Sequence, residues 1–176
     1  MKKKYFCKFC YKVYNKKEAR AIDFHCCDNP LVDIDEAIAD DISIMNRKGY
    51  YTDNCCAGHY VKGECARSHP YINFYVENLD IIPWLLQHRP LGFTYSIQYY
   101  ENDWRIQINE EEFFDEEKYG FTLIEEEDGT CRYTISEKEY DEKVGYRDEL
   151  LRACIREWVW SLPDLHNTEE EENKKK

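Results

Sequence analysis

DIDEAIADDISIMNRKGYYTDNCCAGHYVKGECARSHPYINFYV, residues 33–76, is the stretch around which the rest of the chain is arranged. Asp33 is a suitable N-cap, and apolar residues recur behind it at three-to-four-residue spacing. This stripe consists of Ile34, Ile38, Ile42 and Met45. Gly49 can end a helix in the left-handed conformation. The pattern therefore predicts an amphipathic helix that begins after Asp33 and stops at Gly49.

A strand, a loop and a returning strand are expected after this helix. Residues 50–52 and the alternating run of residues 71–76 have the composition of strands. Between them, residues 53–59 read Asp-Asn-Cys-Cys-Ala-Gly-His, which we interpret as a loop. Gly58 among thiol and imidazole side chains indicates a backbone arranged around a bound group.

The C-terminal half predicts two β-hairpins. Residues 93–99 alternate cleanly, and residues 104–108 repeat the alternation after a turn. Residues 121–135 form two β-prone runs on either side of Asp128-Gly129, which is a signal for a two-residue turn.

Two further helices complete the predicted elements. Residues 78–89 predict a short helix, and Ser136 with Glu139 forms a capping box that opens a long final helix. The inward stripe of that helix consists of Val144, Leu151, Ile155 and Trp158. We therefore expect an α+β fold, a mostly antiparallel sheet with helices on one face.

The chain divides into three expected parts. Residues 1–32 form a small cysteine-containing module, and residues 33–166 form the α+β domain. Residues 167–176 are almost entirely charged or polar, so this tail is expected to be disordered.

Composition places the chain among globular proteins. It has 176 residues, of which 43% are hydrophobic, and no run of 18 apolar residues that would predict a membrane span. The N-terminal residues lack the apolar segment of a signal peptide, so we expect a cytoplasmic protein that does not enter a membrane. In that compartment the nine cysteines indicate metal ligands or burial, not disulfides.

Charge is distributed unevenly along the chain. The net charge is −12, but residues 1–20 carry +7, so residues 21–176 carry −19. Such an acidic body would repel nucleic-acid phosphates, whereas it can approach the basic surface of a protein partner. The alternative is that the acidic residues only keep the protein in solution.

The N-terminal module contains a candidate zinc site. Cys7 and Cys10 form a C-x-x-C pair, and the adjacent pair Cys26 and Cys27 follows after fifteen intervening residues. Two such pairs can close a tetrahedral zinc site, and the segment resembles zinc-ribbon modules. The second pair departs from C-x-x-C, and His25 could replace one of its members. Buried free thiols are the alternative to a bound zinc.

A possible second site is predicted in the central stretch. Its candidate ligands are Cys55, Cys56, His59, Cys65 and His69. Thiolate and imidazole are the donors that zinc prefers, so their spacing is compatible with a second ion. The alternatives are buried core residues or a nucleophilic Cys55 or Cys56 with His59 as its base, for which the sequence identifies no third member.

Part of the central stretch resembles a known family. Residues 38–76 are similar to the helix–strand–loop signature of the TYW3-like tRNA-wybutosine methyltransferases, on Asn46, Thr52, Cys56 and Gly58. The resemblance implies a related fold, with S-adenosylmethionine-dependent action on RNA or a nucleotide. His59 stands where that family has an arginine, which departs from its anion-binding pattern.

Motifs of the common enzyme classes are absent from the sequence. It contains no G-x-G-x-x-G, P-loop, H-E-x-x-H or G-x-S-x-G, and its acidic residues lie in runs typical of solvated surface. We therefore expect a non-enzymatic, zinc-stapled acidic binding protein that contacts a basic protein surface, while its basic ribbon is a candidate contact for nucleic acid. One hypothesis is an inhibitor of a nucleic-acid-bound effector, such as a phage-encoded anti-CRISPR. The alternative is the TYW3-like activity.

Overall fold

The structure is a computed structural model. It describes residues 2–62, 64–75, 85, 87–100, 103–110, 114–126 and 128–166. The expected tail and most of the helix expected at residues 78–89 lie outside the described residues. In chain order the elements are β1 (Lys3–Phe6), β2 (Val13–Tyr14), α1 (Lys16–Ala21), β3 (His25–Cys26), β4 (Asn29–Pro30), β5 (Val32–Asp35), α2 (Ala39–Arg47), β6 (Thr52–Val61), β7 (Ala66–Tyr75), β8 (Phe93–Tyr100), β9 (Asp103–Glu110), β10 (Thr122–Glu125), β11 (Cys131–Thr134), α4 (Glu137–Lys143) and α5 (Gly145–Ser161).

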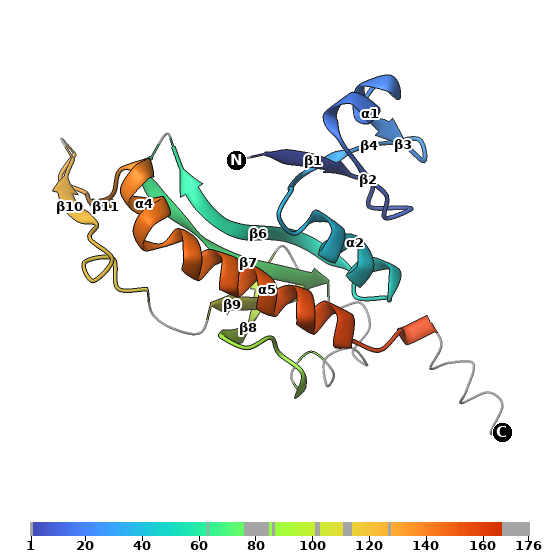
Figure 1. The fold of residues 1–176 in the computed structure, drawn as a ribbon. Helices are drawn as coiled ribbons and strands as arrows, with labels where there is room; N and C mark the ends of the chain where they lie inside the picture. The colour runs from blue at the N-terminus through green and yellow to red at the C-terminus, as the bar shows by residue number, and fades with distance from the viewer. Residues whose placement is uncertain are drawn as a thin grey trace.

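A four-stranded antiparallel sheet lies at the centre of the molecule, with strand order β6-β7-β9-β8. The helix α5 runs along one face of this sheet, and α2 packs beside it against β6 (Figure 1). This arrangement confirms the predicted α+β class with mostly antiparallel pairing. Each helix in the described part of the chain is too short or too polar to span a bilayer.

The main core lies between the sheet and these helices. Ile72 pairs with Ile108 and Phe74 pairs with Ile106, so four fully buried side chains share one face of β7 and β9. Trp158 of α5 contacts Phe74 edge to face, with ring centroids 6.2 Å apart. All four residues of the predicted inward stripe are buried. Leu151, Ile155 and Trp158 of α5 lie in the main core, whereas Val144 precedes α5 and lies in a second core cluster.

The first predicted helix begins later than expected. Residues 32–35 form β5, which pairs with β1 so that Val32 lies opposite Phe6, and α2 starts only at Ala39. A buried Ile34 fits an amphipathic helix and a strand equally well, so the local pattern does not distinguish the two. Pairing with the distant β1 decides the outcome. Gly49, with φ +93°, follows the end of α2 as predicted.

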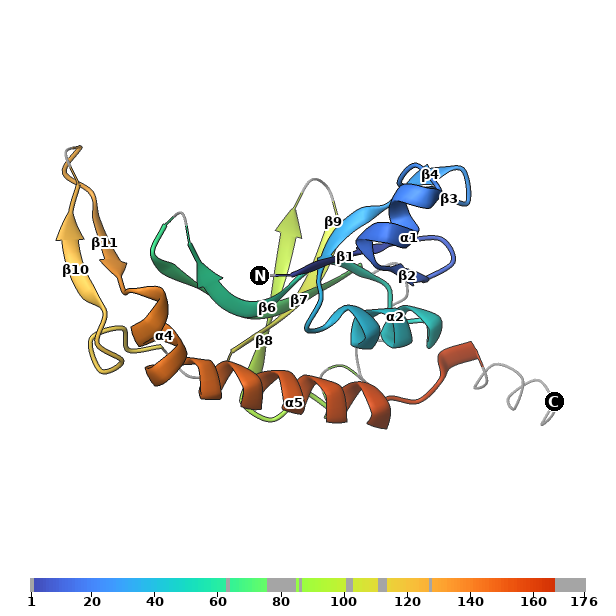
Figure 2. The same cartoon turned by 45° about the horizontal axis from the view of Figure 1, so that its top comes forward.

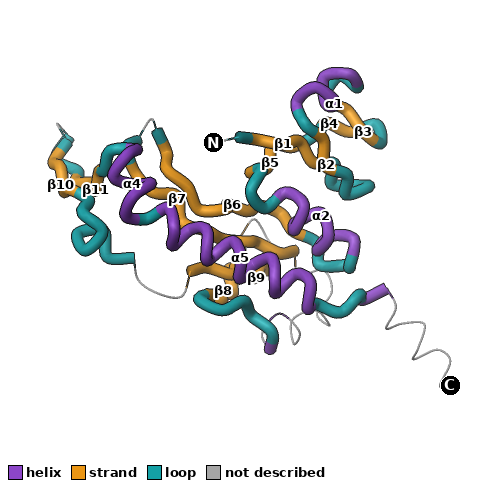
Figure 3. The backbone as a smooth tube through the Cα atoms, viewed as in Figure 1, coloured by secondary structure: helices purple, strands orange, loops and turns teal. Residues whose placement is uncertain are grey.

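The segment at residues 53–59 is a strand and not the expected loop. It belongs to β6, which continues as one long strand through this region (Figure 3). A register shift between Thr52 and Cys55 and a left-handed Gly58 (φ +73°) make this strand irregular. These irregularities explain why the sequence has turn-like composition although the backbone remains paired with β7.

The N-terminal module is joined to the body by strand pairing. β2, β1 and β5 form a three-stranded sheet, and Phe6 at the end of β1 is buried in the main core. Ser43 of α2 donates a hydrogen bond to the carbonyl of Tyr11 at 2.5 Å. The module therefore rests on α2 and β5, as Figure 2 shows.

The hairpin β10–β11 and α4 lie at the end of the molecule opposite the N-terminal module (Figures 1 and 2). The hairpin confirms the prediction, but residues 126–130 connect its strands, so its turn is longer than the two residues expected. A second core cluster beside it consists of Phe114, Phe121, Ile135, Tyr140 and Val144. Ser136 accepts a hydrogen bond from the Glu139 backbone and is an N-cap as predicted. The helix that it opens is the short α4 and not the long final helix, because α5 begins separately at Gly145.

Several acidic side chains are buried, contrary to the expectation that the acidic residues lie on a solvated surface, and two of them share one cation. Glu110 of β9 and Asp148 of α5 both form ion pairs with Arg67 of β7. Each of these three side chains is at most 3% exposed. An ionised carboxylate is tolerated in such a position when a cation and hydrogen-bond donors surround it.

Candidate metal centre

The first cysteine pair lies in a tight turn after β1. The Cys7 amide donates to the Lys12 carbonyl at 3.0 Å, and the Tyr11 amide donates to the Cys7 carbonyl at 2.9 Å. Tyr11 has φ +60°, a left-handed conformation that returns the chain toward β2. This turn brings Cys7 and Cys10 to one side of the module.

The second cysteine pair lies in the β3–β4 hairpin. His25 pairs with Pro30 and Cys26 with Asn29, so Cys27 and Asp28 form its two-residue turn. Both turn residues are left-handed, with φ of +52° and +60°, as in a type I′ turn. The geometry of this hairpin accounts for two adjacent cysteines in place of a second C-x-x-C.

The four thiols of the module form one cluster, which is a possible metal site. All four sulfur atoms lie within 4.8 Å of one another, with 3.5 Å between Cys10 and Cys26 and 3.7 Å between Cys26 and Cys27. Tetrahedral zinc with Zn–S bonds of about 2.3 Å would separate its sulfur ligands by about 3.8 Å. The His25 ring contacts the Asp23 carbonyl instead, with Nδ1 2.6 Å from that oxygen.

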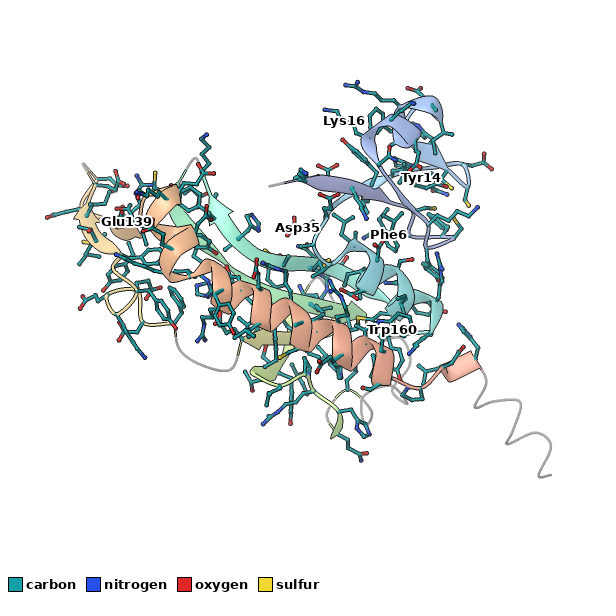
Figure 4. All side chains as sticks on the ribbon, in the orientation of Figure 1. Phe6, Tyr14, Lys16, Asp35, Glu139 and Trp160 are labelled. Carbon is teal, nitrogen blue, oxygen red and sulfur yellow. The ribbon has the colours of Figure 1, made fainter. Side chains whose placement is uncertain are left out.

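Tyr14 of β2 is a further member of this centre that the sequence did not identify. Its hydroxyl lies 3.1 Å from Cys26 Sγ, and Figure 4 shows the tyrosine on the module beside the cysteine sulfurs. The hydrogen bond from Tyr14 lowers the pKa of Cys26 from 9.0 to about 7, while the thiols of Cys26 and Cys10 raise the pKa of Cys27 to about 12. Cys26 is therefore prepared to act as a thiolate, the form of cysteine that binds metals.

The structure brings together only two of the five residues of the possible second site. Cys56 Sγ lies 3.6 Å from His59 Nδ1, and the same nitrogen lies 3.6 Å from Asp35 Oδ2. Asp35 comes from β5, and no motif in the sequence connects it with Cys56. Ser68 of β7 borders the cluster, with its hydroxyl 2.9 Å from Cys56 Sγ.

The other three residues lie apart from this cluster. Cys55 packs against the main core, where burial raises its pKa to about 12. Cys65 is exposed in the turn between β6 and β7. His69 contacts Glu110, with Nδ1 3.4 Å from the carboxylate. Cys55 is separated from Cys56 because adjacent residues of a strand face opposite sides of the sheet. The loop expected from the sequence would not have imposed this separation.

Comparison of the chain with protein-family models, with curated proteins and with solved structures finds no match. The TYW3-like resemblance therefore stays a prediction. Two of its positions have a structural role here, because Asn46 donates to the Thr52 hydroxyl at 2.9 Å and accepts from the Thr52 amide at 3.1 Å. This exchange connects the end of α2 to the start of β6.

Proposed function

We propose that this chain is a zinc-stapled binding protein that docks its acidic end on the basic surface of another protein. Zinc is the ion that best suits four thiolates at tetrahedral spacing. The module around the cysteines has little core of its own, so a bound ion would supply much of its folding free energy.

The single observation that carries the proposal is the concentration of negative charge at one end of the fold. Residues 114–143, which include the β10–β11 hairpin and α4, contain eleven Asp or Glu residues against four Lys or Arg residues. We call these residues the acidic lobe. The exposed acids among its described residues are Asp115, Glu117, Glu125, Asp128, Glu137, Glu139, Asp141 and Glu142. Ion pairs such as Lys138–Glu142 are solvent-exposed and neutralise little of the negative charge of the lobe.

The positive charge lies at the other end of the molecule. Lys16 on the N-terminal module and Glu139 on the acidic lobe occupy opposite ends in Figure 4. Such a charge separation orients the protein as it approaches a partner and increases the association rate. The acidic lobe would meet the basic surface of a protein, while the module would contact nucleic acid or an acidic surface.

A nucleic-acid-bound effector offers both kinds of surface, since its basic channel lies beside bound phosphates. An inhibitor of such an effector, of the anti-CRISPR type, is the narrower form of this proposal. The acidic lobe would then occupy the channel as a substitute for the nucleic acid.

Affinity capture with charge-reversed variants tests the proposal. The lobe variant carries Glu137→Lys and Glu142→Lys on α4, and the matched control carries Glu149→Lys and Glu157→Lys at exposed positions of α5. Both variants gain the same charge. A partner captured at physiological salt by the wild type and the control, but lost from the lobe variant, supports the proposal. Equal capture by all three proteins contradicts it.

A further inference from the structure

We infer that Asp35, Cys56 and His59 form a second metal site, independent of the four-cysteine cluster and open at its fourth coordination position. These residues offer a carboxylate, a thiol and an imidazole, whose ligand atoms all lie within 4.8 Å of one another. This mixed donor set suits zinc among the common biological metals.

The two distances from His59 Nδ1 to the other ligand atoms match those around one small ion. Zn–S, Zn–N and Zn–O bonds of about 2.0–2.3 Å in a tetrahedron place the ligand atoms about 3.4–3.6 Å apart. His59 Nδ1 lies 3.6 Å from Cys56 Sγ and 3.6 Å from Asp35 Oδ2. The third pair, Cys56 Sγ and the Asp35 carboxylate, lies within 4.8 Å, so an ion would draw these two side chains together.

The same distances argue against a catalytic Cys-His-Asp triad. In a triad the nucleophile contacts one imidazole nitrogen and the acid contacts the other, so that a proton can cross the ring. Here Cys56 and Asp35 both approach Nδ1 of His59. Three donor atoms that converge on one point define a coordination site and not a proton relay.

The irregular backbone of β6 creates this convergence. In a regular strand Cys56 and His59, three residues apart, would face opposite sides of the sheet. Gly58 has φ +73°, which interrupts the alternation and brings both side chains to the same place. Asp35 is held there from the neighbouring β5, because its Oδ2 accepts a hydrogen bond from the Ala57 amide at 3.0 Å.

Burial supplies a second argument for a cation. Asp35 is 8% exposed and Cys56 is 6% exposed. Within the described part of the chain, His59 is the only basic side chain that pairs with Asp35. A buried carboxylate beside a buried thiol requires compensation, and a metal ion would provide it while converting the thiol to the thiolate.

The fourth position is the functional part of this inference. Zinc sites with three protein ligands keep a position for water or an exogenous ligand, whereas four-cysteine sites are closed. His59 has a side chain that is 23% exposed, and with Gly58 and Arg152 it lines a cavity of about 310 Å³ beside α4 and α5. The lining has four acidic residues against Lys62 and Arg152, so the cavity suits a small neutral ligand better than an anion. Such a ligand would approach the ion from the side of His59, the one of the three ligands that lines the cavity.

Metal content of the full chain after dialysis against metal-free buffer tests the inference. We expect two zinc ions in the wild type and one in Cys56→Ala, His59→Ala and the nearly isosteric Asp35→Asn. Cys65→Ser, which alters an exposed cysteine outside both clusters, should keep two. A wild type whose zinc content is unchanged by all three site variants overturns the inference. A single ion that Cys56→Ala removes would instead support this site and contradict zinc at the four cysteines.

Cadmium-113 NMR of the cadmium-substituted chain gives a readout that does not depend on the number of metal ions measured per chain. The resonance moves downfield with each thiolate ligand, so the two sites should give two well-separated signals. His59→Ala should remove the signal of the one-thiolate site and leave the four-thiolate signal in place. Its unchanged four-thiolate signal also shows that this variant is folded in the module. A wild-type spectrum with the four-thiolate signal alone overturns the inference.

Discussion

Arg67 of β7 donates two hydrogen bonds to a single carboxylate oxygen of Asp148 in α5, from Nε at 3.2 Å and from Nη2 at 2.6 Å. Its remaining nitrogen donates to Glu110 of β9 at 2.7 Å. Tyr140 of α4 donates to the other oxygen of Asp148. This buried network connects the sheet to both C-terminal helices at a single arginine.

Replacing the arginine should destabilise the fold strongly. Arg67→Met leaves the Asp148 carboxylate buried without its cation, while Glu110 keeps its ion pair with Arg147. Loss of one partner from a buried pair costs about 3–5 kcal/mol. Arg132→Met, which removes an arginine from the exposed β11, is the control and should change stability by less than about 1 kcal/mol. Urea unfolding of the two variants measures both values. A similar midpoint for the two would show that the network contributes little.

Stability should fall in acid because of Glu110. Burial alone would raise the pKa of this carboxyl, but hydrogen bonds from His69, Arg67 and Arg147 outweigh it and lower the pKa from 4.5 to about 2. A lowered folded-state pKa gives stability that is present above pH 4.5 and is lost as the pH falls toward 2. The loss should reach about 3 kcal/mol, at 1.36 kcal/mol per pKa unit.

The measurement compares wild type and Glu110→Gln by denaturant unfolding from pH 5 to pH 2. The variant lacks the titrating group, so the difference in unfolding free energy between the two proteins should shrink as the pH falls. Acid release of a bound metal affects both proteins and cancels in this difference. A difference that stays constant over the whole range would contradict the role of Glu110.

Removal of metal by a chelator should loosen the N-terminal module locally. Hydrogen exchange should accelerate most in the two cysteine turns, residues 7–12 and 25–30, because the sulfur–metal bonds hold these turns together. β1 should keep more protection, since it pairs with β5 and buries Phe6 in the main core. Cys154→Ser, far from the cluster in the sequence, should respond to the chelator as the wild type does. Uniform acceleration over the whole chain would contradict a local role.

Alanine at Gly58 should cost more than alanine at Gly129. Both glycines are left-handed, with φ of +73° and +82°, and this conformation costs other residues about 1–2 kcal/mol. A Cβ at Gly58 would also lie 3.0 Å from Cδ of Pro70, whereas a Cβ at Gly129 meets nothing within 4 Å. The difference in melting temperature between Gly58→Ala and Gly129→Ala therefore separates the effect of the Pro70 contact from the cost of the left-handed backbone. Equal melting temperatures would show that Pro70 moves away from the added Cβ without a measurable cost in stability.

The sequence by itself determined the elements whose signal is local. The inward stripe of α5, the cap at Ser136 and both C-terminal hairpins follow from residues a few positions apart, because helix and strand periods act over that range. The two cysteine pairs of the module also have a local signal. Each pair lies in one tight turn, so the spacing predicts that its two cysteines lie together.

Only the tertiary structure decided the features that depend on partners distant in the chain. Residues 32–35 became a strand because β1 pairs with them, and Glu110 is buried because Arg67 lies on the adjacent strand. Asp35 joins Cys56 and His59 through packing of β5 on β6, a contact that no local spacing encodes. The physical reason is common to these cases: strand pairing and the burial of charge are set by which segments meet in space, and local propensity is too weak to oppose them.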